Sequence, residues 1–142
     1  MNDRFKLKRF VDAQAQIYPQ VVAELRAGRK QSHWMWFIFP QISGLGHSAM
    51  AQKYAIGSRQ EAAAYLAHAV LGPRLRECTD LVLAVENRSI HDILGSPDDL
   101  KFRSSMTLFA EVADHDLFRR AIARYFAAGF DQATLNILRP AT

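Results

Sequence analysis

The sequence is poor in cysteine, in long apolar runs and in turn-forming residues. Cys78 is the only cysteine among 142 residues, which excludes an internal disulfide and a cysteine-based zinc site. No apolar stretch approaches the length of a membrane span, and the N-terminal residues lack the apolar core of a secretory signal. The 7 glycines and 5 prolines are too sparse for a disordered linker. These absences predict one globular domain over residues 1–142, located in the cytoplasm.

The common catalytic and metal-binding motifs are also missing. No glycine-rich dinucleotide fingerprint, no Gly-Lys-Ser/Thr loop and no Gly-x-Ser-x-Gly elbow occurs. Neither a His-x3-His pair nor paired carboxylates accompany the 5 histidines. The sequence therefore predicts no metal site and no cofactor.

Charge narrows the range of partners. The net charge is +4, but most cations have acidic neighbours, and only Arg4, Lys6, Lys8 and Arg9 cluster. This distribution argues against a surface that tracks the phosphates of a nucleic acid. An anionic small molecule would need only two or three of these cations. No feature of the sequence indicates an oligomeric state.

Apolar residues recur at helical spacing behind capping residues, with no hairpin signal and no repeat. Ser58 with Glu61 three residues later forms a capping-box pattern. Ser96-Pro97-Asp98-Asp99 also predicts a helix start, with Ser96 as the cap, proline in the first position and acids at the positive end. We predict a mainly α fold, a single compact domain of seven or eight short helices around a buried aromatic segment.

That aromatic segment, residues 29–41, is the most distinctive stretch and holds both tryptophans. If it is extended, side chains alternate and both faces are apolar, which predicts burial on both sides. A buried helix fits the same run, because periodicity cannot separate the two in so short a segment. Pro40 ends the regular structure in either case.

Two interpretations of this segment remain open. In one, the aromatic side chains are simply core. In the other, polar neighbours line the mouth of an aromatic-walled cleft in which Trp34 or Trp36 stacks on a base. The candidate ligand-binding residues are Lys30, Arg74 and Lys101 for a phosphate, Ser32, Ser104 and Ser105 for a sugar, and Gln41 at the mouth.

Several motifs along the chain resemble a known family. They are residues 30–41, Gly44-Leu45-Gly46, Glu61-Ala62-x-x-Tyr65-Leu66, Leu71-Gly72-x-Arg74-Leu75 and Lys101-x-x-Ser104-Ser105-Met106-Thr107-Leu108-Phe109. This pattern closely resembles the family catalogued as domain of unknown function 1810, some members of which are labelled calpastatin. The family name itself implies no activity.

A more distant resemblance is to the NADAR proteins of the YbiA type. It is carried by Ala51-Gln52-Lys53-Tyr54, Glu61-Ala62-Ala63, Gly72-x-Arg74 and Lys101-Phe102. This resemblance implies an α-helical domain that cleaves N-glycosidic bonds in riboflavin intermediates or ADP-ribosylated bases. The chain departs from that pattern at Gly46-His47, where the NADAR family has Ser-Glu-His.

We therefore predict binding of a phosphorylated, nucleotide-like anion such as an ADP-ribose derivative. If chemistry follows, we expect N-glycosidic hydrolysis with His33 or Glu61 as the acid–base group. A carboxylate normally stabilises the oxocarbenium-like transition state, and the glutamate that the NADAR pattern has before His47 is absent here. The alternative is a non-catalytic protein-interaction module whose aromatic core is purely structural.

Overall fold

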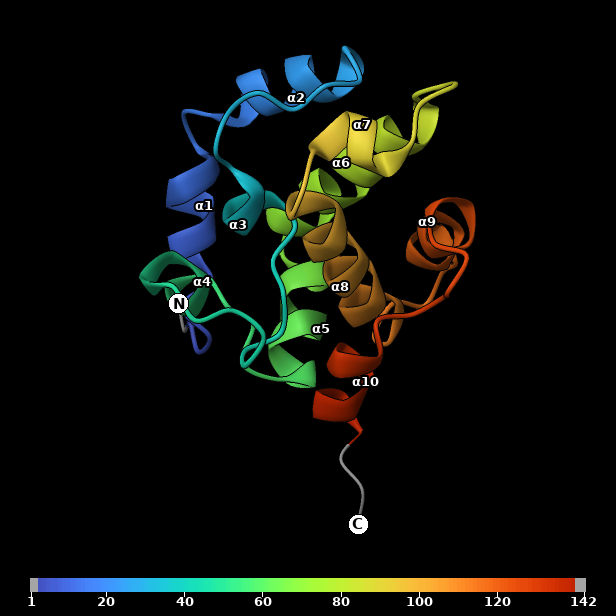
Figure 1. The fold of residues 1–142 in the computed structure, drawn as a ribbon. Helices are drawn as coiled ribbons and strands as arrows, with labels where there is room; N and C mark the ends of the chain where they lie inside the picture. The colour runs from blue at the N-terminus through green and yellow to red at the C-terminus, as the bar shows by residue number, and fades with distance from the viewer. Residues whose placement is uncertain (1–2, 140–142) are drawn as a thin grey trace.

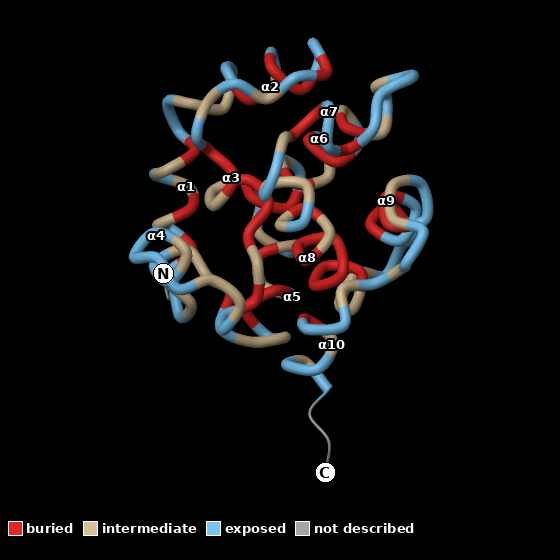
Figure 2. Tube along the Cα trace, viewed as in Figure 1, coloured by how far each residue is buried: buried red, intermediate tan, exposed pale blue. Residues whose placement is uncertain are grey.

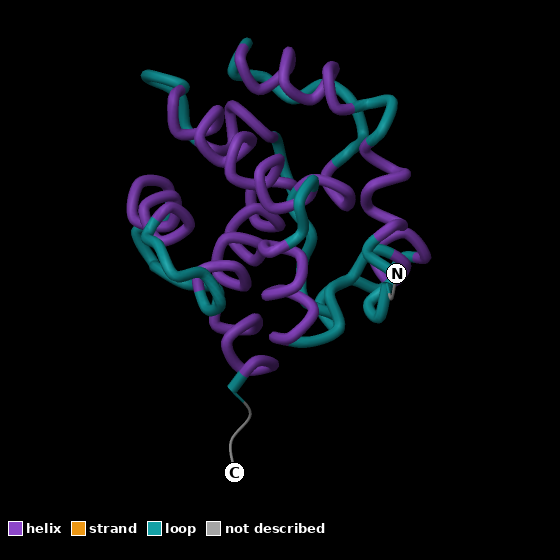
Figure 3. The backbone as a smooth tube through the Cα atoms, turned by 180° about the vertical axis from the view of Figure 1, so that it is seen from behind, coloured by secondary structure: helices purple, strands orange, loops and turns teal. Residues whose placement is uncertain are grey.

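The computed structural model describes residues 3–139, which form ten helices and no β-strand (Figure 3). The helices are α1 (Lys8–Gln14), α2 (Tyr18–Arg26), α3 (Met35–Ile38), α4 (Ala49–Lys53), α5 (Arg59–Ala67), α6 (Leu71–Ala84), α7 (Ile90–Leu94), α8 (Asp98–Ala110), α9 (Leu117–Tyr125) and α10 (Gln132–Leu138). The only extended pairing in this range is an isolated parallel bridge between Ile42 and Ile56. The predicted mainly α class is confirmed. The helices outnumber the seven or eight predicted because single turns such as α3 carry too little periodic pattern.

Helix α8 runs through the middle of the fold, with the other helices around it (Figure 1). It packs against α5, α7, α9 and α10. From Ser104 to Ala110 every residue of α8 is buried, whereas the outer faces of α2 and α9 are exposed (Figure 2). A helix that is buried on nearly all sides is expected only where neighbours surround it, so α8 is the centre of the core.

Aromatic side chains from helices far apart in sequence meet in that core. Phe39 contacts Phe102 of α8 edge-on, with ring centroids 4.9 Å apart. Tyr65 of α5 lies between Phe10 of α1 and Phe109 of α8, at 5.2 and 5.3 Å. Each such fully buried ring contributes on the order of 2 kcal/mol to stability. The buried residues form one contiguous cluster, which ties both halves of the chain together.

Residues 29–41 turn neither into a strand nor into a long helix. They form a loop, the single turn α3, and a further irregular stretch through Pro40. Met35 and Ile38 are buried, while Trp36 and Phe37 are half-buried. The predicted buried aromatic segment is present, and the helical alternative holds only for its central turn.

Two predicted helix starts differ in detail from the structure. The Ser58 hydroxyl accepts a hydrogen bond from the Glu61 amide, as predicted, but the Glu61 carboxylate bonds the Gly57 amide instead of closing the box. Helix α8 begins at Asp98 without a side-chain cap, so the predicted capping role of Ser96 is wrong. The complete capping box lies at Ser89, at the start of α7.

Close backbone packing explains the glycine at position 72. A Cβ added at Gly72, in the first turn of α6, would lie 2.1 Å from the Leu66 carbonyl oxygen. No side chain fits there, and only glycine lets α5 and α6 approach so closely. Of the described residues, none belongs to a helix long and apolar enough to cross a membrane.

Candidate functional site

A buried carboxylate organises the loop that leads into the aromatic segment. Glu24 of α2 is only 4% exposed. Its carboxylate accepts hydrogen bonds from the backbone amides of Gln31 and Ser32 at 2.7 and 2.9 Å, and from the Ser32 hydroxyl at 2.6 Å. The Trp34 indole and the Gln20 amide donate as well, at 3.0 and 2.9 Å. Five donors on one carboxylate fix the conformation of the loop.

The charge on Glu24 is stabilised by these donors. Desolvation alone would raise its pKa, but the hydrogen bonds from Ser32 and from the Gln31 amide outweigh it and lower the pKa to about 2. The sequence analysis missed this residue. A signal was present, because Glu24 lies three residues after Val21 and directly before Leu25, on the buried face of α2.

The Glu24 network seals Trp34 into the core. Its ring is 1% exposed, and the Lys30 ammonium lies over it at 5.1 Å from the ring centroid. Trp34 therefore has no face open to a base in this conformation. Ser32 is likewise occupied, since its hydroxyl donates to Glu24.

Trp36 lies differently, in the wall of a shallow surface pocket. The pocket is lined by Trp36, Gln41 and Lys101, together with Met35, Phe39, Pro40, Ala51 and Tyr54. The space left for a water-sized group is about 10 Å³, which holds about one water molecule. The structure thus brings three of the predicted ligand-binding residues together, around a pocket that is nearly closed.

Two features of Trp36 distinguish it from a core residue. The Lys101 ammonium lies 5.4 Å from the centroid of its ring. Its indole Nε1 is buried, yet among residues 3–139 it has no hydrogen-bond partner. A buried N–H group without a partner costs about 1–3 kcal/mol, so an oxygen atom that reached Nε1 would form a favourable hydrogen bond.

Asp98 links the two lysines of the site. Lys30 lies 2.9 Å from one Asp98 oxygen and Lys101 lies 3.8 Å from the other. The Lys30 side chain is 8% exposed and the Lys101 side chain 29%. One carboxylate faces two ammonium groups, so the cluster carries a net positive charge next to Trp36. The sequence predicts Asp98 only as an acid at the positive end of a helix. It does not predict that Asp98 pairs with two lysines.

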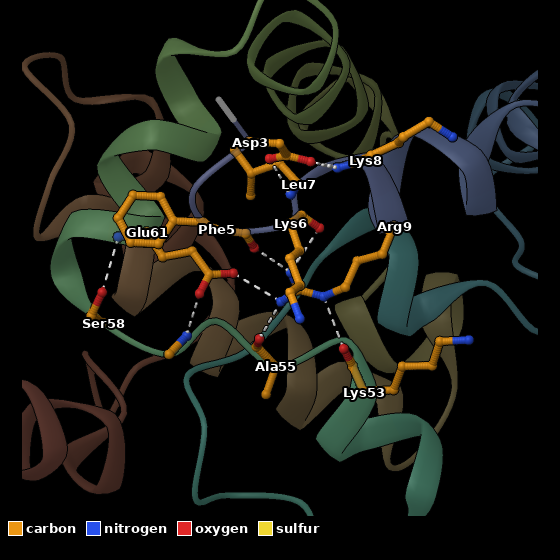
Figure 4. Close-up of polar contacts among 11 residues, drawn as sticks. Asp3, Phe5, Lys6, Leu7, Lys8, Arg9, Lys53, Ala55, Ser58 and Glu61 are labelled. Atoms are coloured by element: carbon orange, nitrogen blue, oxygen red, sulfur yellow. Dashed lines mark hydrogen bonds and ion pairs between the residues drawn. The ribbon is translucent and has the colours of Figure 1, made fainter. Parts of the chain in front are cut away.

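The Glu61 carboxylate is held by an ion pair and hydrogen bonds within the protein (Figure 4). It is 7% exposed, and one oxygen pairs with Arg9 Nη2 at 2.8 Å while the other accepts from the Gly57 amide. Arg9 also donates to the carbonyls of Lys53 and Ala55, on either side of the pocket residue Tyr54. The Arg9–Glu61 pair therefore supports the wall of the pocket from behind.

His33 is exposed, and no ion pair joins it to a carboxylate within the described chain. An acid–base histidine needs a partner that orients it and tunes its pKa. The structure does not supply that pairing for His33, nor does it bring His33 and Glu61 into contact.

The remaining predicted ligand-binding residues, Arg74, Ser104 and Ser105, lie outside the Trp36 pocket. Arg74 lies over the Tyr18 ring, 4.5 Å from its centroid, and donates to Gln14. The Ser104 hydroxyl bonds Asp131 at 2.9 Å and is buried. Ser105 is fully buried, and its hydroxyl has no partner in the described range. None of these three lines the Trp36 pocket, so the structure does not bring them to the other candidate residues.

The described residues do not include a cluster of metal ligands. Within residues 3–139 no three His, Cys, Asp or Glu side chains gather closely enough to hold an ion. Cys78 is buried, and that burial raises the pKa of its thiol to about 12, with a nearby hydrogen bond to Tyr18 opposing the shift. The candidate site is therefore the Trp36 pocket with its lysines.

Comparisons with known proteins show which structure and which family this chain is similar to. The crystal structure of the conserved hypothetical protein Rv1873 from Mycobacterium tuberculosis is similar to it, with a TM-score of 0.95 and 56% sequence identity over 98% of this chain and 100% of that one. No curated protein matches the chain. The likeness to NADAR proteins and the calpastatin label therefore stay predictions. Residues 4–138 match the family described as protein of unknown function (DUF1810). The chain therefore belongs to the DUF1810 family.

Proposed function

We propose that the protein binds a phosphorylated, nucleotide-like anion at the Trp36 pocket. One observation carries the proposal: an indole ring with an unpartnered N–H lies in the same pocket as a lysine that is only loosely held. A flat ring can stack on the indole, an oxygen can accept from Nε1, and a phosphate can pair with Lys101. An ADP-ribose derivative combines these three groups.

Access requires Lys101 to move. Its ammonium covers the Trp36 ring, and a cation–π contact at a partly exposed site is worth about 0.5–1 kcal/mol. Stacking of a base on an aromatic side chain is worth about 1–3 kcal/mol. A bound ring therefore offsets the loss of the lysine from the indole face. We expect the pocket to open on binding, since its present volume holds about one water.

The displaced lysine then becomes available to the phosphate. Its contact with Asp98 is 3.8 Å long, beyond hydrogen-bond distance, whereas Lys30 holds Asp98 at 2.9 Å. Because Lys30 remains paired with Asp98, Lys101 can move away without leaving that carboxylate unpaired. We expect Lys101 to be the main phosphate contact and Lys30 to act at a distance.

Hydrolysis of an N-glycosidic bond has less support than ligand binding. The Glu61 carboxylate is already paired with Arg9, and His33 lacks an acidic partner in the described chain. We propose binding as the function and do not extend the proposal to catalysis.

Isothermal titration with ADP-ribose tests the proposal. We expect saturable binding to the native protein, with weaker binding of adenosine, which lacks the phosphate, and of ribose 5-phosphate, which lacks the adenine base. Lys101→Met should weaken ADP-ribose binding by about 10- to 100-fold, since a hydrogen bond to a charged group is worth about 1.5–3 kcal/mol.

Lys8→Met is the matched control, because Lys8 is exposed and pairs only with Asp12 on its own helix. It should leave the affinity unchanged. No heat signal with millimolar ADP-ribose, or equal affinities for the Lys101 and Lys8 variants, would reject the site.

A further inference from the structure

A second pocket lies at the opposite end of α8 from Lys101, and we infer that it binds a small zwitterion, an α-amino acid with an apolar side chain. The pocket is lined by Ala110, Glu111, Arg119, Phe130, Leu135 and Arg139. It joins the C-terminal end of α8 to α9 and α10. Its residues take no part in the Trp36 site, so this inference does not depend on the proposed function.

The size of the pocket suits a molecule of this class. Its volume is about 110 Å³. A water-sized group needs about 10–15 Å³ of such space, so the pocket holds roughly 7 to 11 non-hydrogen atoms. That is the size of an amino acid such as leucine and too small for a nucleotide. Ala110, Leu135 and the partly exposed Phe130 supply apolar contacts for the side chain.

Glu111 supplies a place for an ammonium group. Its side chain is 10% exposed, and a single nitrogen of Arg139 lies 2.6 Å from Oε1 and 2.8 Å from Oε2. One guanidinium nitrogen serves both oxygens, so the carboxylate keeps lone pairs for a second cationic donor. Glu111 also follows the last turn of α8, where the negative end of the helix dipole attracts a cation.

The arginines supply the place for a carboxylate. Arg139 and Arg119 both line the pocket, and Arg59 reaches Glu111 from outside it at 3.8 Å. Arg119 is exposed, and it makes no ion pair or hydrogen bond with any of the described residues. Two guanidinium groups pair with the Glu111 carboxylate and a third lines the same pocket, which leaves a net positive charge for an anion. A simple anion would be repelled by Glu111 Oε1, whereas an amino acid satisfies both charges.

Calorimetric titration of the full chain with L-leucine, isocaproate and isoamylamine tests this inference. Isocaproate lacks the ammonium group and isoamylamine lacks the carboxylate, while both keep the apolar side chain. We expect saturable binding of L-leucine at millimolar concentration and affinities at least about tenfold weaker for the other two.

Two arginine variants test the location. Arg119→Met should weaken L-leucine binding by about tenfold or more. Arg120→Met is the matched control, because Arg120 is the adjacent exposed residue of α9 and pairs with Asp116; it should bind like the wild type. Trp36→Phe should also bind L-leucine normally, which separates this site from the other pocket.

Three results would overturn the inference. They are absence of L-leucine binding at high millimolar concentration, isocaproate binding as tight as that of L-leucine, and an Arg119→Met variant that retains full affinity. The last result, obtained with a variant that is folded by circular dichroism, would place any binding elsewhere on the molecule.

Discussion

Replacing Glu24 by glutamine should destabilise the protein by about 3 kcal/mol at neutral pH. The pKa of this carboxyl falls from 4.5 to about 2 in the folded protein. Converted at about 1.4 kcal/mol for each pH unit, this difference gives about 3 kcal/mol of stability that depends on the ionised carboxylate. Glutamine removes that charge and turns an N–H₂ group toward donors that need an acceptor.

The same residue makes the stability depend on pH in a defined direction. Because the folded-state pKa lies below the unfolded-state pKa, the stabilisation is complete above pH 4.5 and is lost as the pH falls toward 2. About 2 kcal/mol should already be lost at pH 3. The Glu24→Gln variant lacks this contribution, so the difference in stability between wild type and variant should shrink as the pH is lowered.

Urea unfolding followed by tryptophan fluorescence at pH 7 and at pH 3 measures both effects. Glu86→Gln is the control, since Glu86 is exposed and makes no ion pair within the described residues. A Glu24→Gln variant as stable as the control at pH 7, or a difference from wild type that stays constant down to pH 3, would refute the role assigned to this carboxylate.

Three further predictions concern packing and reactivity. Gly72→Ala should cost about 2–3 kcal/mol in urea unfolding, because the new methyl group meets the Leu66 carbonyl; a neutral variant would contradict the close approach of α5 and α6. Arg9→Met should cost about 3 kcal/mol in the same assay by leaving the buried Glu61 carboxylate unpaired, and an unchanged midpoint would contradict that pairing. Cys78 should resist alkylation by iodoacetamide at pH 8 until urea unfolds the protein, since burial raises its thiol pKa to about 12; rapid alkylation of native protein would contradict that burial.

Much of the fold follows from local signals in the sequence. Apolar spacing and capping residues predict the mainly α class, and Ser48 and Ser58 cap their helices as such residues should. The outcome for the aromatic segment was not predictable locally, because a run apolar on both faces fits a strand or a helix equally well. Its short turn is set by tertiary contacts, chiefly the Glu24 carboxylate holding the preceding loop.

The site was only partly predictable for a similar reason. Lysine, glutamine and tryptophan at residues 30–41 and 101 suggested a cleft, and the structure brings Trp36, Gln41 and Lys101 together. Sequence could not tell which tryptophan would be sealed, since that depends on the hydrogen bond from Trp34 to Glu24. Residue type likewise did not reveal that Ser104 would bond Asp131 across the core.

The indole N–H groups of the two tryptophans offer the most direct test of ligand binding at the Trp36 pocket. In a proton–nitrogen correlation spectrum each indole gives one signal, and Trp36→Phe assigns them. On titration with ADP-ribose, the Trp36 signal should shift in a saturable way as Nε1 gains an acceptor, while the Trp34 signal, held by Glu24, should stay in place. A Trp36 signal that does not move at millimolar ADP-ribose would contradict the proposed function.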